Sequence, residues 1–368
     1  MSFDRGHIED VRHAGKASIR SLVKHILPDP QGYFSGAYYF CRNPGRTGKP
    51  DRRVGSFFVF LTGAAAGGWR DTSSGEQGDV IDLVALALRL SRGDAIKWLA
   101  NWTGIRQLTG PALLAKQAEW REEERRTAHE DARELDELRR RAKALWLSGK
   151  PIAPPAPGGA PSPAWRYLTE ARAIDLPGIG GAPSLLRWLP SHKHVDSGRE
   201  WPCIAAGIVD MKGDIIGVHR TWLRHDGLDK APVRSPRKVW PRGISGGLIW
   251  LSRGASKHGP IEAGRRGESS IVILAEGIED ALTAAMAERE ARVAAFISLG
   301  YLGDLSDMPW ASGYVVLRDN DWASPQAVAQ FDDAFARLQG FGKPCEWIAS
   351  PHGKDFNDLA QAISAGAL

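Results

Sequence analysis

The chain has 368 residues, of which 43% are hydrophobic and 25% are charged, so collagen-like and wholly disordered classes are excluded and two or three domains are expected. The 48 basic residues exceed the 43 acidic ones and give a net charge of +5, which is only weak support for a polyanionic partner. No run of about 18 apolar residues could span a membrane, no secretion signal is present, and the three widely spaced cysteines favour a reducing cytoplasm.

Residues 1–108 are predicted to form a small α+β domain. A helix is expected over residues 8–26, ending before two prolines. Two β-rich stretches follow, at residues 38–41 and 56–61. Asp79 then has the position of an N-cap before an amphipathic helix, and a second helix is expected to start near Ser91.

Residues 109–163 are predicted to connect this domain to the rest of the chain. Between 112 and 148, Glu and Arg alternate densely around one narrow apolar stripe, which is typical of a solvated helix without a ligand. The stretch PIAPPAPGGAPSP at 151–163 is a Pro-rich linker, which marks the best domain boundary in the sequence.

Residues 164–368 alternate strand and helix patterns. A helix is expected over 165–171 and short strands over 204–209 and 215–222. Three later apolar runs have the character of buried parallel strands, with helical patterns at 279–289 and 325–338 between and after them. These runs are residues 271–275, 293–299 and 314–317. The alternation predicts an α/β fold with an open, doubly wound, mostly parallel sheet.

Acidic residues follow two of these three runs. The first run leads directly into Glu276 and Gly277, and the third ends in Asp319-Asn320-Asp321. Ligands bind at the carboxyl ends of the strands in such sheets, and alternation along an extended segment points Asp319 and Asp321 the same way. Those two carboxylates can therefore share one cation.

A third acidic group, Asp355 and Asp358 in the sequence GKDFND, follows the strand-like residues 345–349. Oxygen ligands without accompanying His or Cys suit Mg²⁺ or Mn²⁺ better than zinc. Acidic residues are also common as helix caps and in turns, so one D-x-D sequence carries little weight. The recurrence of acids after three strands is what favours a metal site.

A basic segment lies between residues 218 and 242, where only Asp226 and Asp229 oppose seven basic residues. The basic residues are Arg220, Arg224, Lys230, Arg234, Arg237, Lys238 and Arg242. Trp222 and Trp240 are interleaved with them, a pattern that suits stacking and phosphate contacts with a single strand of nucleic acid. For the two tryptophans, a place in the core is the simpler interpretation.

The acidic arrangement resembles the Toprim domain, which is shared by bacterial-type primases, topoisomerases and certain nucleases. The matching residues are Glu276, Gly277, Asp280, Ser298-Leu299-Gly300, Asp319 and Asp321. Further sequences resemble primases. GDIIGVHRTWLRHDG at 213–227, followed by SPRKVW at 235–240, is similar to the basic segment that precedes Toprim in the primase polymerase core, and PHGKDFNDL at 351–359 is similar to the closing acid motif of phage and plasmid primases. The resemblance implies a primase polymerase core with a basic part over 164–262 and a Toprim domain over 263–368.

The resemblance also implies roles for individual residues. Glu276 is expected to be a general acid/base or a metal ligand, Asp319 and Asp321 to hold Mg²⁺ or Mn²⁺, and Asp280 and Asp355 to be further ligands. The implied activity is synthesis of RNA primers from nucleoside triphosphates on single-stranded DNA, with a separate replicative helicase as a possible partner. A Toprim nuclease and a non-catalytic nucleic-acid-binding replication accessory remain alternatives.

The N-terminal region resembles the zinc-binding domain of bacterial primases, through GEQGDVIDLV and GDAIKWLANW and the strand before them. The metal ligands of that domain are not matched. Cys41 is the only cysteine there, and the sequence WRDTSSGEQGD has Asp, Thr and Ser where a ligand pair would lie. A domain without zinc is therefore predicted, held together by its apolar strands and helices.

Overall fold

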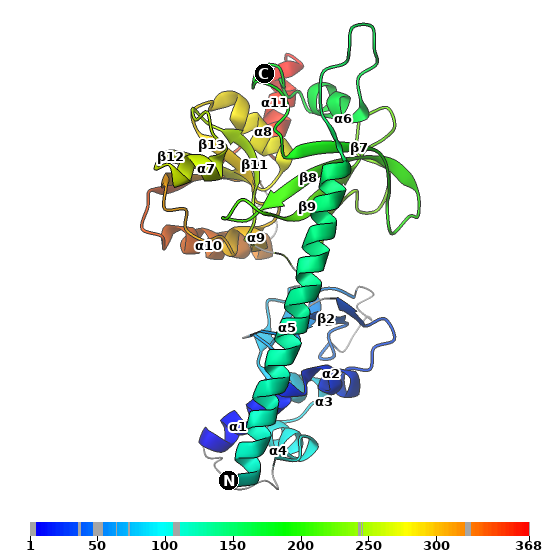
Figure 1. The fold of residues 1–368 in the computed structure, drawn as a ribbon, viewed down its shortest axis with the longest axis vertical. Coiled ribbons are helices and arrows are strands. Elements are labelled where there is room, and N and C mark those ends of the chain that lie inside the picture. The colour runs from blue at the N-terminus through cyan, green and yellow to red at the C-terminus, as the bar shows by residue number, and fades with distance from the viewer. Residues whose placement is uncertain are drawn as a thin grey trace. The chain divides into compact units, whose positions relative to one another are not determined.

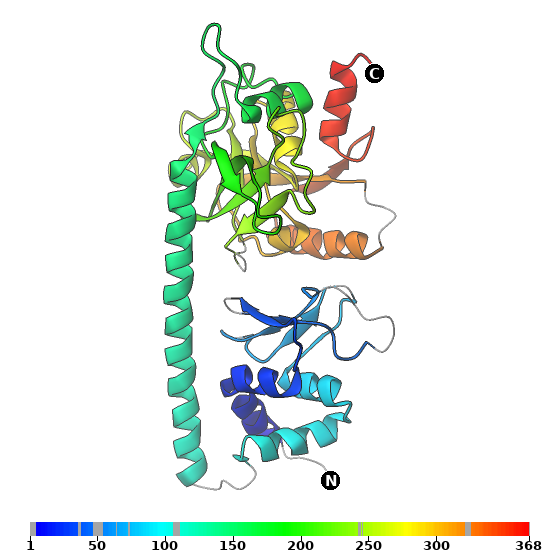
Figure 2. The ribbon, with the colours of Figure 1, turned by 90° about the vertical axis from the view of Figure 1, so that its right-hand side faces the viewer.

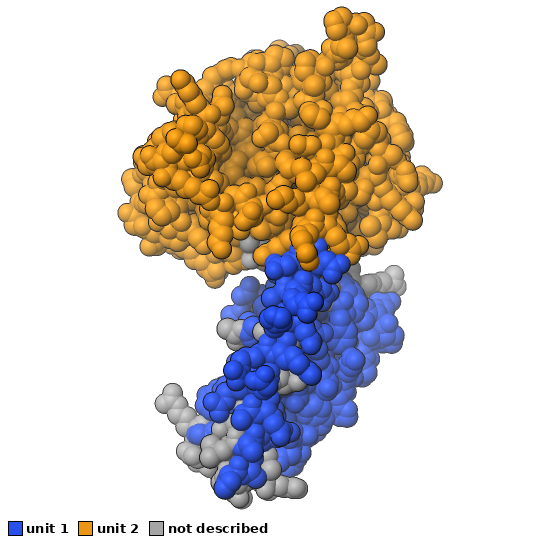
Figure 3. All heavy atoms as spheres, in the orientation of Figure 1, with its two compact units in different colours: residues 1–137 blue, residues 138–368 orange. Residues whose placement is uncertain are grey.

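The structure is a computed structural model. It describes residues 5–35, 38–46, 54–63, 65–72, 74–105, 111–241, 244, 246–320 and 325–367. The chain divides into two compact units, residues 1–137 and 138–368, which are coloured separately in Figure 3. None of the helices in these ranges combines the length and the apolar character that crossing a membrane requires. The domain boundaries predicted at 108, 163 and 262 stay a prediction.

The first unit is built on an antiparallel sheet in which each strand pairs with the next along the chain. Its strands are β1 (Tyr33–Ser35), β2 (Tyr38–Cys41), β3 (Phe57–Phe60), β4 (Trp69–Asp71) and β5 (Gln77–Gly78). Its helices α1 (Arg5–Ala17), α2 (Ile19–Ile26), α3 (Val80–Leu88) and α4 (Arg92–Trp102) lie on one side of the sheet in Figure 2. Alternate strand residues such as Cys41, Phe57 and Val59 are buried in one core with these helices.

Two helix N-termini in this unit lie where they were predicted, but its first helix does not have the predicted range. Asp79 forms a capping box with Asp82, because each side chain accepts a hydrogen bond from the backbone N–H of the other residue. Ser91 caps α4 by accepting from the N–H of Asp94. The single helix predicted over 8–26 is wrong: the chain leaves helical geometry at Ser18, where neither glycine nor proline signals the break.

Helix α5 (Pro111–Ser148) confirms the charged helix predicted over 112–148. Its polar composition leaves few apolar side chains to bury. Trp120 packs against the core of the first unit, while Ala142, Leu145 and Trp146 belong to a core of the second. The Pro-rich stretch follows the short strand β6 (Lys150–Pro151) and has neither helix nor strand before α6 (Pro163–Arg166).

The second unit begins with an antiparallel sheet in the order β10-β9-β8-β7-β6. Its longer strands are β7 (Leu186–Lys193), β8 (Glu200–Val209), β9 (Ile215–Trp222) and β10 (Arg237–Trp240). Helix α6 continues into a π-helical turn at Tyr167–Ala171. Strand β9 matches its predicted range, whereas β10, within the basic segment, was not predicted.

A second sheet of this unit has the order β11-β13-β12-β14-β15, with β11 antiparallel to β13 and the other pairs parallel. The strands are β11 (Ile249–Arg253), β12 (Ser270–Ala275), β13 (Arg292–Ala295), β14 (Ala311–Arg318) and β15 (Cys345–Ala349). The mostly parallel α/β fold is therefore confirmed. The run predicted as a strand over 293–299 is shorter, because Ile297 adopts a left-handed φ of 73° and a helix starts at Leu299.

Helices cover both faces of this parallel sheet. They are α7 (Pro260–Arg265), α8 (Ile278–Ala287), α9 (Leu299–Gly303), α10 (Pro325–Gln339) and α11 (Phe356–Ser364). In Figures 1 and 2, α8 and α11 lie on one side of the sheet, and α9 and α10 on the other. Val272, Leu274 and Val316 share a buried core with α9 and α10. This packing fixes the strand ends from which the acidic residues project.

Candidate active site

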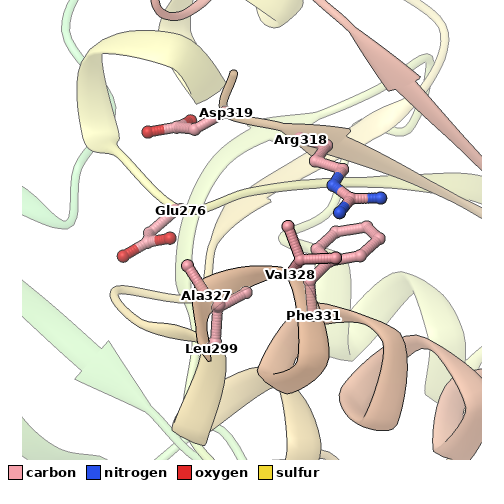
Figure 4. Close-up of a pocket in the computed structure, with 7 residues that line it drawn as sticks. All are labelled: Glu276, Leu299, Arg318, Asp319, Ala327, Val328 and Phe331. Carbon is pink, nitrogen blue, oxygen red and sulfur yellow. The ribbon is translucent and has the colours of Figure 1, made fainter. Parts of the chain in front are cut away.

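Glu276 and Asp319 occupy the same edge of the parallel sheet. Glu276 follows β12 and Asp319 follows β14, and these two strands are neighbours that pair in parallel register. Both residues line two pockets, a small one and a larger one. Figure 4 is a close-up of the small pocket and shows their carboxylates pointing to the same side. Gly277 is the N-cap of α8, so the chain turns into the helix directly after Glu276. The two acids that the sequence predicted to converge are thus brought together.

Asp280 lies in the first turn of α8 and is only 7% exposed. One of its carboxylate oxygens accepts a hydrogen bond from the backbone N–H of Asn357, at 2.9 Å. Burial, together with the negative charges of Asp355 and Asp319, raises the pKa of Asp280 to about 7. Asp355 and Asp319 therefore lie close enough to Asp280 to influence its ionisation.

Asp355 and its neighbours are held by the loop that follows β15. The side chain of Asp355 caps α11 by accepting from the N–H of Asp358, at 2.9 Å. Lys354, just before it, forms an ion pair with Asp319 at 3.4 Å. Asn320 anchors this loop, because its amide donates to the carbonyls of residues 350 and 353. This role of Asn320 was not predicted, since it depends on a contact 30 residues away.

The larger of the two pockets has a volume of about 300 Å³ and walls of opposite charge. Glu276, Asp280, Asp319 and Asp355 line it from the ends of the parallel strands and the starts of α8 and α11. The antiparallel sheet supplies further lining residues, namely His219, Arg237, Lys238 and Val239. Burial lowers the pKa of His219 to about 4, so its imidazole is neutral at pH 7. An anionic ligand that brings a cation with it suits such a pocket.

The residues of the predicted basic segment do not act as one surface. Arg237 and Lys238 line the pocket, and Lys238 also pairs with Asp196. Arg224 is exposed and paired with Asp226 at 2.7 Å, and Arg234 is exposed. Arg242 lies outside the described residues, as does Asp321 in the acidic cluster.

Arg220 has a different environment from the other basic residues. It is 8% exposed, and its guanidinium lies 5.0 Å from the ring centre of Trp222 and 5.9 Å from that of Trp240. Side chains alternate between the two faces of a strand, so Arg220 lies on the face of β9 opposite to His219. Trp222 is fully buried, which confirms its predicted place in the core. A phosphate contact by Arg220 does not fit this burial.

Sequence reasoning missed Glu279 as a member of the site. It is buried beside Asp280, accepts a hydrogen bond from the hydroxyl of Tyr167 at 2.6 Å, and pairs with Lys230 and Arg237. Burial alone would raise the pKa of Glu279, but the two cations and the hydroxyl lower it to about 2. Glu279 is therefore ionised throughout the physiological range.

The donor set of the acidic wall fits a hard divalent cation. Carboxylate oxygens are the ligands that Mg²⁺ and Mn²⁺ prefer. Burial and the charges of Asp355 and Asp319 raise the pKa of Asp280, and a bound cation would neutralise those charges. Within the described ranges, which exclude Asp321, no three His, Cys, Asp or Glu side chains form a group that could hold a metal ion. Glu276 and Asp319 line the same pocket, and their role as metal ligands stays a prediction.

Comparison with known families assigns this part of the chain to a class. Residues 271–366 match the family model described as "Toprim domain", and residues 136–251 match a model described as "Domain of unknown function (DUF7146)". The chain therefore contains a Toprim domain, as its acidic motifs predicted, and Glu276, Asp280, Asp319 and Asp355 all lie within it. None of the curated proteins matches the chain.

Several solved structures of primases are similar to the chain. The primase of Aquifex aeolicus, with its zinc-binding and RNA polymerase domains, is 16% identical, with 100% of this chain and 84% of that chain covered and a TM-score of 0.36. A DnaG primase catalytic domain bound to single-stranded DNA is 14% identical, with 64% and 78% covered and a TM-score of 0.39. The primase fragment of the bacteriophage T7 primase-helicase is 13% identical, with 45% and 59% covered and a TM-score of 0.31.

Proposed function

We propose that the protein is a primase-like, metal-dependent nucleotidyltransferase that synthesises RNA primers on single-stranded DNA during replication. One observation supports this most strongly. Glu276 and Asp319 of the Toprim domain line a pocket to which Arg237 and Lys238 also contribute. Phosphoryl transfer needs its negative charge neutralised and its reactants aligned, and a pocket with acidic and basic walls offers both.

In this proposal Glu276 and Asp319, together with Asp321, hold Mg²⁺ or Mn²⁺, and the ion when bound neutralises phosphate charge. Asp280 and Asp355 add negative charge beside them. The side chain of Arg237, which lines the same pocket, binds phosphate groups, and Lys238 beside it adds positive charge to this wall. In the same proposal, Glu276 accepts a proton from an attacking hydroxyl.

The proposed substrates are nucleoside triphosphates and a single-stranded DNA template. A separate replicative helicase is a proposed partner, and the cytoplasm is the proposed location. The first unit is proposed to fold without zinc, because Cys41 is its only cysteine. Burial raises the pKa of the Cys41 thiol to about 12, and this disfavours the thiolate that zinc requires.

A primer-synthesis assay tests the proposal. The wild type, Glu276→Gln and Asp319→Asn would be incubated with single-stranded templates and ribonucleotides, with and without Mg²⁺ or Mn²⁺. We expect metal-dependent primers from the wild type and a loss of about 100-fold or more in both variants. Glu346→Gln, which removes an exposed carboxylate from β15, is the matched control and should retain activity.

Three results would contradict the proposal in different ways. Undiminished synthesis in both variants would remove the assigned site. Strand scission instead of nucleotide incorporation on the same gel would identify a Toprim nuclease. Binding of single-stranded DNA that survives both substitutions, without any metal-dependent turnover, would identify a non-catalytic accessory protein.

A further inference from the structure

Glu279 is an ionised carboxylate buried directly behind the basic wall of the pocket. Its side chain is 11% exposed and belongs to α8, between the pocket residues Glu276 and Asp280. The hydroxyl of Tyr167 donates to one carboxylate oxygen at 2.6 Å. Lys230 lies 3.7 Å from the same oxygen, and Arg237 lies 3.9 Å from the other. Burying a carboxylate with its partners rarely adds net stability, so the arrangement calls for another explanation.

Three segments that are distant in sequence meet at this carboxylate. Tyr167 comes from the π-helical turn after α6, Lys230 from the loop after β9, and Arg237 from the start of β10. Glu279 itself comes from the helix whose first turn carries Asp280. The carboxylate therefore links the basic sheet to the acidic helix of the Toprim domain. It sets the position of the cations relative to the acidic wall.

Lys230 and Arg237 would repel each other without this carboxylate. Burial lowers the pKa of Lys230, and the positive charge of Arg237 nearby lowers it further. The side chain of Arg237 is 47% exposed and lines the pocket, so it has room to move into solvent. Its ion pair with Glu279, at 3.9 Å, opposes such a movement.

We propose that Glu279 is a positioning residue that holds Arg237 on the pocket wall, where Arg237 receives the phosphate groups of the substrate. This inference rests on the proposed function, because it assumes that the pocket binds nucleotides or nucleic acid. The phosphate can belong to a nucleoside triphosphate or to the DNA backbone. Both sources present phosphate oxygens to the wall, and the binding experiment below distinguishes them.

The substitution Glu279→Gln separates positioning from simple electrostatics. Glutamine keeps the size of the side chain and an oxygen that accepts from Tyr167, but it makes the wall more positive by one charge. If only net charge mattered, an anionic ligand would bind more tightly to the variant. If position matters, the same ligand binds more weakly, despite the added positive charge.

The experiment measures binding of ATP with Mg²⁺, and separately of a fluorescent single-stranded oligonucleotide, to the full chain at several salt concentrations. We expect affinity about tenfold weaker in Glu279→Gln for whichever ligand places its phosphate on this wall, since charge-assisted contacts of this size are lost. The salt dependence should also become shallower, because fewer phosphates are contacted. In primer synthesis, KM should rise while kcat changes little.

Two further variants keep the test decisive. Tyr167→Phe removes only the hydroxyl that donates to Glu279 and should weaken binding in the same direction by a smaller factor; it carries the test if Glu279→Gln does not fold. Glu262→Gln is the matched control, since Glu262 also pairs with two arginines, at 2.9 and 3.9 Å, but lies on α7 outside the pocket lining. It should leave affinity unchanged.

The outcomes distinguish a failure of this inference from a failure of the proposed function. Tighter or unchanged binding of both ligands in folded Glu279→Gln would overturn the positioning role, while active wild type would leave primer synthesis intact. A wild type that binds neither ligand and makes no primers would overturn both. Weaker ATP binding alone assigns the wall to the incoming nucleotide, and weaker oligonucleotide binding alone assigns it to the strand.

Discussion

Each unit of the chain contains a nearly fully buried aspartate, and the two have different partners. Asp71, at the end of β4, accepts a hydrogen bond from the amide of Asn43 at 2.7 Å and pairs with Arg46 at 3.0 Å. Asp280, at the start of α8, accepts a backbone N–H and is surrounded by the negative charges of other carboxylates, which help to raise its pKa to about 7. The charge of Asp71 is thus balanced within its own unit. The charge around Asp280 calls for a cation from outside.

The comparison separates two uses of buried carboxylates. A buried carboxylate whose cation and amide are supplied by neighbouring loops stabilises the fold. A cluster whose members raise one another's pKa works against the fold and is typical of functional sites. Substitutions that treat both aspartates alike should therefore have opposite effects.

The largest effect is expected from Asp71→Asn. The substitution leaves Arg46 without its carboxylate and sets two amides against each other, which should destabilise the first unit by about 3 kcal/mol. Amide hydrogen exchange in β3 and β4 reports on this unit by itself. Asp94→Asn, at a carboxylate that is 56% exposed, is the control and should change little. Unchanged protection of these amides from exchange in Asp71→Asn would show that Asp71 does not stabilise its unit in the way that this comparison requires.

Asp280→Asn should have the opposite sign. A pKa raised to about 7 means that the folded state binds this proton more tightly than the unfolded chain does. In the absence of divalent metal, the stability that Asp280 contributes is therefore present below about pH 4 and is lost as the pH rises through 7. Asparagine still accepts from the N–H of Asn357 and removes the loss, so the variant should be more stable by about 2 kcal/mol at pH 8.

Thermal melts at pH 5 and pH 8 in a chelating buffer measure this difference. Between pH 5 and pH 8, the melting temperature of the wild type should fall relative to that of Asp280→Asn. A wild type that gains stability over that range, compared with the variant, would show that Asp280 is neutralised within the fold, as Asp71 is.

The arginines sharpen the comparison further. Arg46 balances Asp71, so Arg46→Ala should lower stability without affecting ligand binding. Arg237 lines the pocket with an exposed guanidinium, so Arg237→Ala should weaken nucleotide or oligonucleotide binding by about tenfold, with little change in stability. Arg234→Ala removes an exposed arginine that does not line the pocket and is the control, with an expected change below about twofold. Equal losses at Arg234 and Arg237 would point to a diffuse basic surface instead.

The acidic half of the site was predictable from the sequence because it depends on the order of strands and acidic residues along the chain. Apolar runs mark buried strands, parallel strands end at one edge, and the residues after them meet there. Glu276 and Asp319 were found in this way. The same reasoning overextended the strand before Leu299, since an apolar composition does not reveal the left-handed turn at Ile297.

The basic half of the site depends on which face of a strand each side chain occupies and on partners that are distant in sequence. Amino-acid composition shows neither. Counting charges grouped Arg220 with Arg237. In the sheet, Val239 of β10 pairs with His219 of β9, so alternation puts Arg237 on the face of His219 and Arg220 on the opposite face. Glu279 resembles an ordinary helix-start acid until its partner Tyr167, 112 residues away, is placed beside it. Predicting β10 as a strand would have corrected the first error but not the second.

Asparagines in the two units give the smallest and most specific test. Asn43 donates to the carboxylate of Asp71, whereas Asn320 donates to the carbonyls of Ser350 and Gly353, at 3.0 and 2.9 Å, and so fixes the loop that carries Asp355. Asn320→Ala should cost about 1 kcal/mol of stability and lower primer synthesis about fivefold.

The isosteric change Asn320→Asp decides whether the donor is what matters. Aspartate has the same shape but turns acceptor oxygens toward two carbonyls and adds negative charge beside Asp319, so it should be at least as damaging as alanine in both melting temperature and activity. If aspartate were tolerated better than alanine, Asn320 would act by filling space rather than by holding the loop. The acidic wall would then owe its shape to the strand ends alone.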